Sequence, residues 1–241
     1  MSNAPVILAI WNDIVPERIE EYEAWHTLEH VPERVWVPGF IGATRYLALG
    51  DAAPRYLTLY ETDSVDTLKS PAYVDLVEHP TNWSASMRPS FRNFLRQPCV
   101  VVASAGNSAG AWTLASRFAL PSRSSVAHLS TITQTLLKAG AKHCVTSVQL
   151  GEVLDVSPQA LENATANQGG IEYLLIVQSA LGPGESDLRT LVQQATQALL
   201  GNSIYQIHGV YRFASRVEHE AVKAPTRPPQ RTDLMSQWQP V

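Results

Sequence analysis

The stretch "WHTLEHVPERVWVPGF", Trp25 to Phe40, holds a helix end and a strand entry within sixteen residues. His26 and His30 are four residues apart, so both lie on one face of a helix. The residue before a proline is disfavoured in the α conformation, and Val31 precedes Pro32. The helix is therefore predicted to end near His30. Pro38 and Gly39 then form a turn that leads into a strand. The stretch therefore predicts a corner between a helix and a sheet.

The first half of the chain continues this pattern in both directions. Short β-branched runs and alternating polar and apolar residues indicate strands, and turn residues separate one element from the next. We expect strands at 6–10, 40–49, 55–62 and 92–104, and helices at 12–30 and 64–79, the second split at Pro71. The order is β-α-β-β-α-β.

The second half repeats this order after the small, flexible segment "SAGNSAG", residues 104–110. We expect strands at 111–120, 143–154, 170–180 and 203–217, and helices at 124–142 and 184–201. Residues 157–170 resemble a loop. From residue 220 onward a Pro-rich, polar tail is predicted to lie extended on the surface or to be partly disordered.

Two β-α-β-β-α-β units indicate an α+β protein made of two tandem ferredoxin-like units. Their bounds are 1–103 and 111–219, with a linker at 104–110 and a tail at 220–241. Each unit leaves one face of its four-stranded sheet uncovered, and that face needs a partner. We therefore expect the two sheets to pack against each other as an intramolecular α+β barrel.

Composition excludes several classes of protein. The chain has 241 residues, 45% of them hydrophobic, and a net charge of −4. These values suit a globular protein and give no sign of a nucleic-acid partner, which would favour a basic patch. The segment before strand one lacks the basic start of a signal peptide, and no apolar run is long enough to span a membrane. Cys99 and Cys144 do not form a C-x-x-C motif. We expect a cytoplasmic protein with no membrane partner.

The segment His26 to His30 also spells H-x-x-E-H, a spacing found in zinc proteases. Two observations speak against a zinc site. Pro32 is expected to end the helix just after the motif, and the motif lies in a small β-α-β-β unit rather than in the large helical domain of those enzymes. A neutral-pH proton carrier is a second possibility, since histidine titrates near neutrality. A packed helix end without chemistry is the third. We expect no metal and no cofactor, although an exposed histidine in a barrel could also serve as a haem ligand.

The motifs resemble those of one known group. Trp25-His26, His30-Val31-Pro32, Pro38-Gly39-Phe40 and Arg45-Tyr46 are similar to the pattern of the dimeric α+β barrel superfamily. They are most similar to its EthD-like and muconolactone isomerase-like branch. In that branch the histidine of His-x-Pro is the usual candidate acid/base at the mouth of a cleft. The resemblance therefore points to His30 and implies that the first half, which alone has these motifs, contains the cleft.

The residues around this corner suggest a ligand site. We expect His30 and His26 to be catalytic, and Arg45, Tyr46, Tyr60, Trp11 and Trp25 to bind the substrate. An arginine fork suits a carboxylate or enolate oxygen, and tyrosine hydroxyls can donate hydrogen bonds. The predicted function is a cofactor-independent isomerase or lyase of catabolism that moves a proton next to a carbonyl or lactone. The alternatives are a non-catalytic ligand-binding or structural protein and a haem-binding barrel. A homodimer is possible in each case.

Overall fold

The structure is a computed structural model that describes residues 5–49, 54–154, 170–182, 190 and 204–238. The helix expected at 184–201 and almost all of the loop expected at 157–170 lie outside the described residues. So do the side chains of residues 204–208, which include His208. No described helix has the length and hydrophobicity needed to cross a bilayer.

Eight antiparallel strands form a closed barrel in the order β1-β3-β2-β8-β5-β7-β6-β4. The strands are β1 (Val6–Ile14), β2 (Phe40–Ala48), β3 (Tyr56–Thr62), β4 (Phe91–Gly106), β5 (Trp112–Leu120), β6 (Val145–Val153), β7 (Ile171–Ser179) and β8 (Ile204–Glu218). Strands therefore lie in all the regions where the sequence predicts them. What the sequence did not predict is how the two halves join.

The expectation of two ferredoxin-like units packed sheet to sheet is wrong, because the two long strands cross from one half to the other. Strand β4 pairs with β1 over residues 91–100 and with β6 over residues 99–106. Strand β8 pairs with β5 over residues 204–212 and with β2 over residues 211–218. The sheets are thus joined edge to edge into one barrel, which leaves no sheet edge unpaired.

The strand β4 also includes Ser104–Gly106, the first part of the expected linker. These small residues pair with β6, where Ser104 lies opposite Gln149. The proposed division of the chain into 1–103 and 111–219 stays a prediction.

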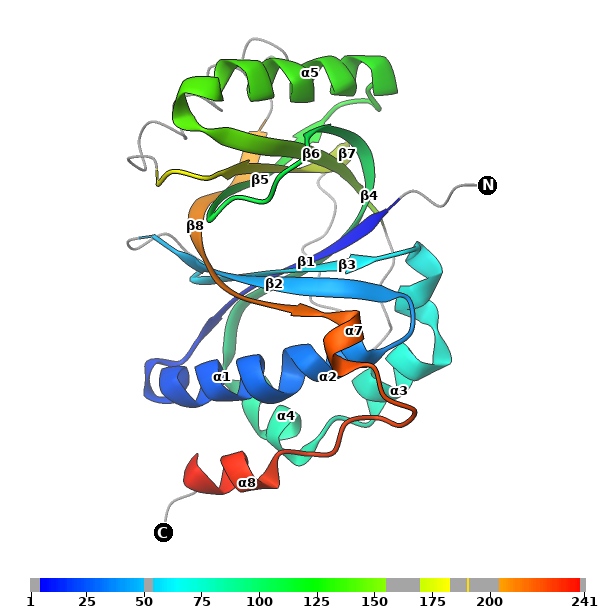
Figure 1. Ribbon diagram of the computed structural model, residues 1–241, viewed down its shortest axis with the longest axis vertical. Helices are drawn as coiled ribbons and strands as arrows, with labels where there is room; N and C mark the ends of the chain where they lie inside the picture. The colour runs from blue at the N-terminus through cyan, green and yellow to red at the C-terminus, as the bar shows by residue number, and fades with distance from the viewer. Residues whose placement is uncertain (1–4, 50–53, 155–169, 183–189, 191–203, 239–241) are drawn as a thin grey trace.

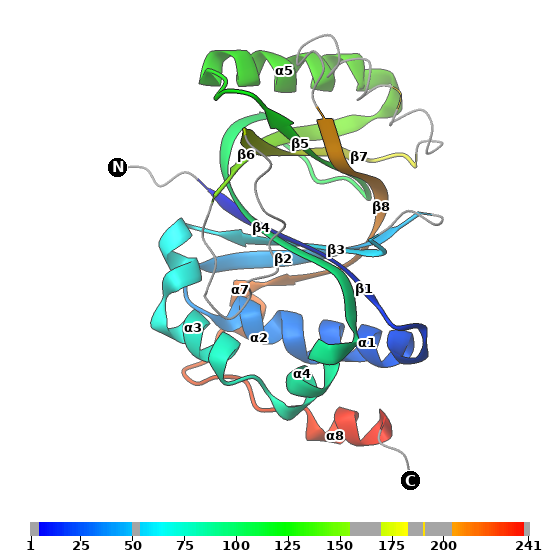
Figure 2. The same cartoon turned by 180° about the vertical axis from the view of Figure 1, so that it is seen from behind.

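Helices cover two opposite sides of the barrel (Figures 1 and 2). On one side lie α1 (Ile19–Trp25), α2 (Val31–Trp36), α3 (Pro71–Glu78) and α4 (Asn82–Met87). On the other side lies α5 (Val126–Ala139), with Ser125 as its N-cap. Short 3-10 turns lie between these elements: η1 (Pro16–Arg18), η3 (Val65–Lys69), η4 (Arg88–Ser90) and η5 (Ala141–His143). Helix α3 begins at Pro71, as predicted.

The first helix does not end at His30, which corrects the sequence-based prediction. The five residues of η2 (His26–His30) form a π-helical turn, and α2 continues from Val31 to Trp36. The backbone N–H of Val31 donates to the carbonyl of His26, five residues earlier. Pro32 has no N–H to donate and its ring would clash with the preceding turn of a regular helix. The wider π turn relieves this clash, so the helix passes through the proline.

The tail is ordered against the first half over residues 220–238, here called the C-terminal strap. It contains most of α7 (His219–Val222) and all of α8 (Thr232–Met235) and η7 (Ser236–Trp238). It runs across the outer side of α1 to α4 (Figure 1). Leu234 and Met235 pack against the cluster that includes Tyr22, Trp25 and Trp83. This apolar anchoring is why the strap is not disordered.

Strand alternation divides the side chains between the barrel interior and the helix-covered outside. The interior cluster contains Trp11, Tyr46, Leu57 and Leu59, packed with residues of both halves. Tyr60 lies in the outside cluster below α2 and α3, and Tyr56 lies in the outside cluster below α1 and α4. Alternation along β3 thus places Tyr56 and Tyr60 on the face opposite Leu57 and Leu59.

Candidate active site

A cavity of about 330 Å³ lies between the outer face of the barrel and the helices of the first half. Its volume is near the lower end of the range for small-ligand pockets, about 300–1,000 Å³. The apolar side chains in its wall are Leu8, Ile10, Phe40, Val77, Phe91 and Phe94. The polar, charged or amphipathic ones are Asn12, Trp25, His26, His30, Arg34, Tyr60, Tyr73, Ser84, Arg88 and Arg96.

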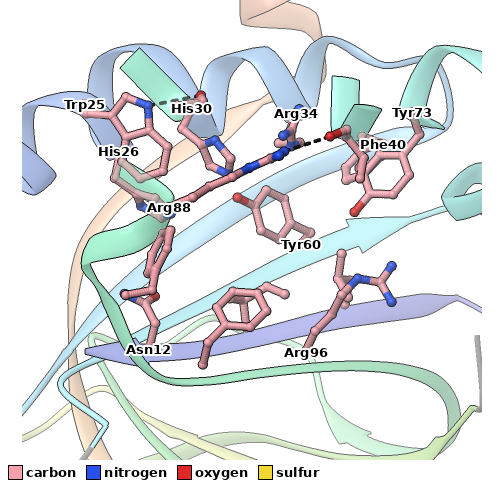
Figure 3. Close-up of a pocket in the computed structure, with 16 residues that line it drawn as sticks. Asn12, Trp25, His26, His30, Arg34, Phe40, Tyr60, Tyr73, Arg88 and Arg96 are labelled. Atoms are coloured by element: carbon pink, nitrogen blue, oxygen red, sulfur yellow. Dashed lines mark hydrogen bonds between the residues drawn. The ribbon is translucent and has the colours of Figure 1, made fainter. Parts of the chain in front are cut away.

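Four of the seven predicted site residues meet in this cavity. Trp25, His26 and His30 reach it from the helix, and Tyr60 reaches it from β3 (Figure 3). The indole N–H of Trp25 donates to Ser84 Oγ over 3.2 Å, which fixes the ring. The imidazole of His30 lies 4.4 Å from the Trp25 ring, centroid to centroid.

The other three predicted residues lie elsewhere. Trp11 and Tyr46 point into the barrel interior, where Gln178 Nε2 donates to the Tyr46 hydroxyl over 2.9 Å. Arg45 is buried beneath α1, where it pairs with Glu23 at 2.9 Å and donates to Thr27. It does not line the cavity. Neighbouring positions on a strand face opposite sides, so Arg45 and Tyr46 could not both line one pocket.

The π turn aligns a row of rings along the helix. The Tyr22 ring stacks on His26 at 4.9 Å, and His26 stacks on His30 at 5.3 Å, centroid to centroid. Tyr22 donates its hydroxyl proton to Asn12 Oδ1 over 3.0 Å. The Nδ1 atoms of His26 and His30 are buried and have no hydrogen-bond partner among the described residues. The two imidazoles are thus held by stacking rather than by hydrogen bonds.

Both histidines are uncharged at neutral pH. Burial lowers the pKa of His30 well below its usual value, and the charges of Arg34, Arg88 and Arg45 lower that pKa further. Burial also lowers the pKa of His26, with smaller contributions from Arg45, His30 and Arg34. A neutral imidazole can accept a proton, so His30 has the protonation state of a base.

Tyr60 keeps its proton. Burial raises the pKa of its hydroxyl strongly, although the positive charge of Arg34 works in the opposite direction. A protonated tyrosine in a cavity can donate a hydrogen bond to a ligand oxygen. Tyr60 therefore complements His30, since one donates and the other accepts.

The cavity also contains arginines that the sequence did not single out. Arg34 lies one helical turn beyond His30, and Arg88 comes from η4. Figure 3 shows their side chains converging between His30 and Tyr60, whereas Arg96 lies apart from them on the sheet side. The i, i+4 spacing of His26, His30 and Arg34 could have indicated Arg34. The expected helix end at His30 hid this spacing.

The H-x-x-E-H motif does not form a metal site here. Glu29 turns away from the cavity, and its two carboxylate oxygens accept hydrogen bonds from Thr81 Oγ1 at 2.7 Å and from the backbone N–H of Arg231 at 2.6 Å. The described part of the chain contains no cluster of three or more histidine, cysteine or acidic residues suited to a metal ion. Glu29 instead anchors the C-terminal strap.

Comparison with solved structures finds the same fold in several proteins. An anthrone oxidase-like protein superposes with a TM-score of 0.58 and 11% identity, covering 93% of this chain and 97% of its own. The W145V mutant of chlorite dismutase from Candidatus Nitrospira defluvii gives 0.55 and 6%, covering 92% and 94%. A candidate monooxygenase from Fusobacterium nucleatum gives 0.53 and 11%, covering 90% and 96%. These neighbours are members of the dimeric α+β barrel superfamily.

At these identities the likeness concerns the fold alone. No protein-family model matches the sequence, and no curated protein matches it. The EthD-like and muconolactone isomerase-like branch therefore stays a prediction.

Proposed function

We propose that this protein is a small-molecule enzyme that removes a proton from a carbon next to a carbonyl, with His30 as the base. The observation that carries the proposal is a neutral His30 in a cavity wall beside Arg34, Arg88 and the protonated Tyr60. The proton passes from carbon to the imidazole, and its electron pair becomes an enolate. The arginines and the Tyr60 hydroxyl stabilise the negative oxygen. The step requires only side chains of this chain.

The fate of the enolate defines the type of enzyme. Return of the proton at another carbon gives an isomerase, and loss of a leaving group gives a lyase. Reaction with dioxygen forms a C–O bond while the electron pair reduces O2 to a peroxide, which takes the proton back from His30 and becomes a hydroperoxide. If the carbon carries a second hydrogen, loss of that hydrogen together with the O–OH hydroxyl releases water and leaves a ketone. The names of two fold neighbours, an anthrone oxidase-like protein and a candidate monooxygenase, favour the third outcome. All three share the proton removal.

Proton removal is tested by hydrogen–deuterium exchange. The protein is incubated in D2O with anthrone, 2-tetralone or α-angelica lactone, and loss of the acidic C–H signal is followed by NMR. An oxygen electrode records O2 consumption in parallel. We expect His30→Gln to slow exchange about 10²- to 10⁴-fold, the usual contribution of a general base. His79→Gln is the matched control, because the His79 side chain is exposed and its imidazole pairs only with Asp75 in the described structure.

Two results would count against the proposal. Equal exchange rates for the wild type and His30→Gln would remove His30 as the base. Binding of the probes without exchange by the wild type would favour the alternative, a ligand-binding protein without chemistry.

A haem does not fit this cavity. An axial histidine usually donates its second ring N–H to a carboxylate or carbonyl, whereas the Nδ1 atoms of His26 and His30 have no such partner in the described part of the chain. The volume of about 330 Å³ suits a ligand of a few rings rather than a tetrapyrrole. The proposed reaction therefore does not involve haem.

A cytoplasmic location and a homodimer stay proposals for this protein. The fold neighbours include chlorite dismutases, but their likeness says nothing of how copies of this chain associate. Light scattering coupled to gel filtration would measure the mass of the particle in solution.

A further inference from the structure

We propose that Arg34 and Arg88 form a carboxylate-binding subsite, so that the ligand is a small carboxylic acid with an apolar body. This inference rests on the cavity being the ligand site of the proposed function. It adds the chemical class of the substrate, which the proton-removal step alone leaves open.

The two guanidinium groups face one small volume, and of the two only Arg34 has a carboxylate, that of Glu33, within ion-pair distance in the described part of the chain. No carboxylate lies among the sixteen described residues that line the cavity. Arg88 donates from Nη2 to the carbonyl of Val77 over 2.7 Å, and the described residues contain no carboxylate within ion-pair distance of it. Burial and the nearby charge of Arg34 both lower the pKa of Arg88. Two cations that destabilise each other in this way favour the arrival of an anion.

Arg34 is buried, and its bonds within the protein are long. It donates to Glu33 Oε2 and to the carbonyl of Leu76, both over 3.3 Å. Glu33 is held more closely by Arg227 of the C-terminal strap, whose Nη2 and Nε lie 2.7 and 2.9 Å from Glu33 Oε1. Glu33 is thus shared by two arginines, and its shorter hydrogen bonds are those with Arg227 rather than with Arg34.

The shape of the site favours a carboxylate. A guanidinium group is a planar fork that matches the two oxygens of a carboxylate, and two such forks can share one group. The sheet side of the cavity provides an apolar surface of Leu8, Ile10 and Phe94, next to Asn12 and Arg96. A ligand with a carboxylate at the arginines and a ring against this surface would present its neighbouring carbon to His30.

The test measures binding rather than turnover. Probes are 2-naphthoate, the uncharged 2-naphthamide and 2-naphthyl phosphate, and their dissociation constants are measured by calorimetry at pH 7.5. We expect 2-naphthoate to bind at least 10-fold more tightly than 2-naphthamide. Arg34→Gln and Arg88→Gln should each weaken 2-naphthoate at least 10-fold while changing 2-naphthamide less than 3-fold, with partial recovery in Arg34→Lys. Arg92→Gln is the matched control, since Arg92 is exposed and lies outside the cavity lining.

Three results would overturn the inference. They are equal affinity for the acid and the amide, equal losses for both probes in the two arginine variants, and tighter binding of 2-naphthyl phosphate than of 2-naphthoate. Thermal unfolding identifies a variant that does not fold, and the other arginine variant then decides. His30→Gln should still bind 2-naphthoate more tightly than 2-naphthamide, because both arginines are intact in this variant. A failed proton-exchange experiment with intact acid selectivity would therefore reject the proposed function and leave the subsite standing.

Discussion

Burial of His26 and His30 affects the stability of the protein as well as its chemistry. In the folded chain both imidazoles stay neutral because burial and nearby arginines lower their pKa values. In the unfolded chain each returns to a pKa near 6.5. Below that pH the unfolded state binds protons that the folded state refuses, so stability must fall as the pH falls.

This linkage predicts an acid-sensitive fold. Between pH 7.5 and pH 5.5, each histidine that stays neutral should reduce the free energy of unfolding by about 1.4 kcal/mol, the equivalent of one pKa unit. The slope from each histidine becomes small above about pH 7.5, where the unfolded state also binds few protons. Urea unfolding at the two pH values measures the loss in the wild type and in His26→Gln. The variant should lose about 1.4 kcal/mol less, and an equal loss in both proteins would contradict a depressed pKa for His26.

At the residue scale the sequence predicted four of the residues that line the cavity. His30, His26, Trp25 and Tyr60 are in the cavity wall, as expected of ring-bearing residues on one helix face and one strand face. Arg34 and Arg88 were missed for different reasons. Arg34 was hidden by the wrong helix end. Arg88 reaches the cavity from a turn whose position depends on how α4 packs, which no local pattern contains.

Among the elements, the C-terminal strap lies along the surface, which is one of the two alternatives that its sequence left open. Its polar, Pro-rich sequence indicates an extended or disordered tail, yet it is fixed by groups far away in the chain. Glu29 and Glu33 project from the outer side of the helix that carries His30 and bind the strap at Arg231 and Arg227. Burial of these two carboxylates is tolerable because the strap supplies their hydrogen bonds. The strap therefore stabilises the helix that carries the site.

Arg227→Ala should destabilise the protein because it leaves the Glu33 carboxylate, which is 2% exposed, without its closest partner. We expect the free energy of unfolding to fall by about 2 kcal/mol, in the range for a hydrogen bond to a charged group. Lys223→Ala is the matched control. Lys223 lies in the same strap, but its pair with Glu220 is exposed and should contribute less than about 0.5 kcal/mol. Chemical denaturation measures both variants, and equal losses would show that Glu33 does not depend on Arg227.

At the scale of the whole molecule, the order of elements was largely predictable and the closure was not. Alternation and turn residues show where strands lie, because those signals are local. The pairing of β4 with β6 and of β8 with β2 joins residues from opposite halves, such as Cys99 with Val153 and Thr44 with Arg216. Nothing local distinguishes a long strand that changes neighbours from a strand followed by a linker. Small residues at 104–106 therefore suggested a linker where β4 continues.

Closure makes each half depend on the other. Without residues 107–241, β2 loses β8, the second part of β4 loses β6, and the interior faces of Trp11 and Tyr46 lose their cover. Open edges and an exposed apolar face favour association. We therefore expect residues 1–106, expressed alone, to form oligomers or aggregates, and to form a 1:1 complex when co-expressed with residues 107–241. Gel filtration with light scattering measures both particles. A well-folded monomer of 1–106 would show that the first half holds its own core without the closed barrel.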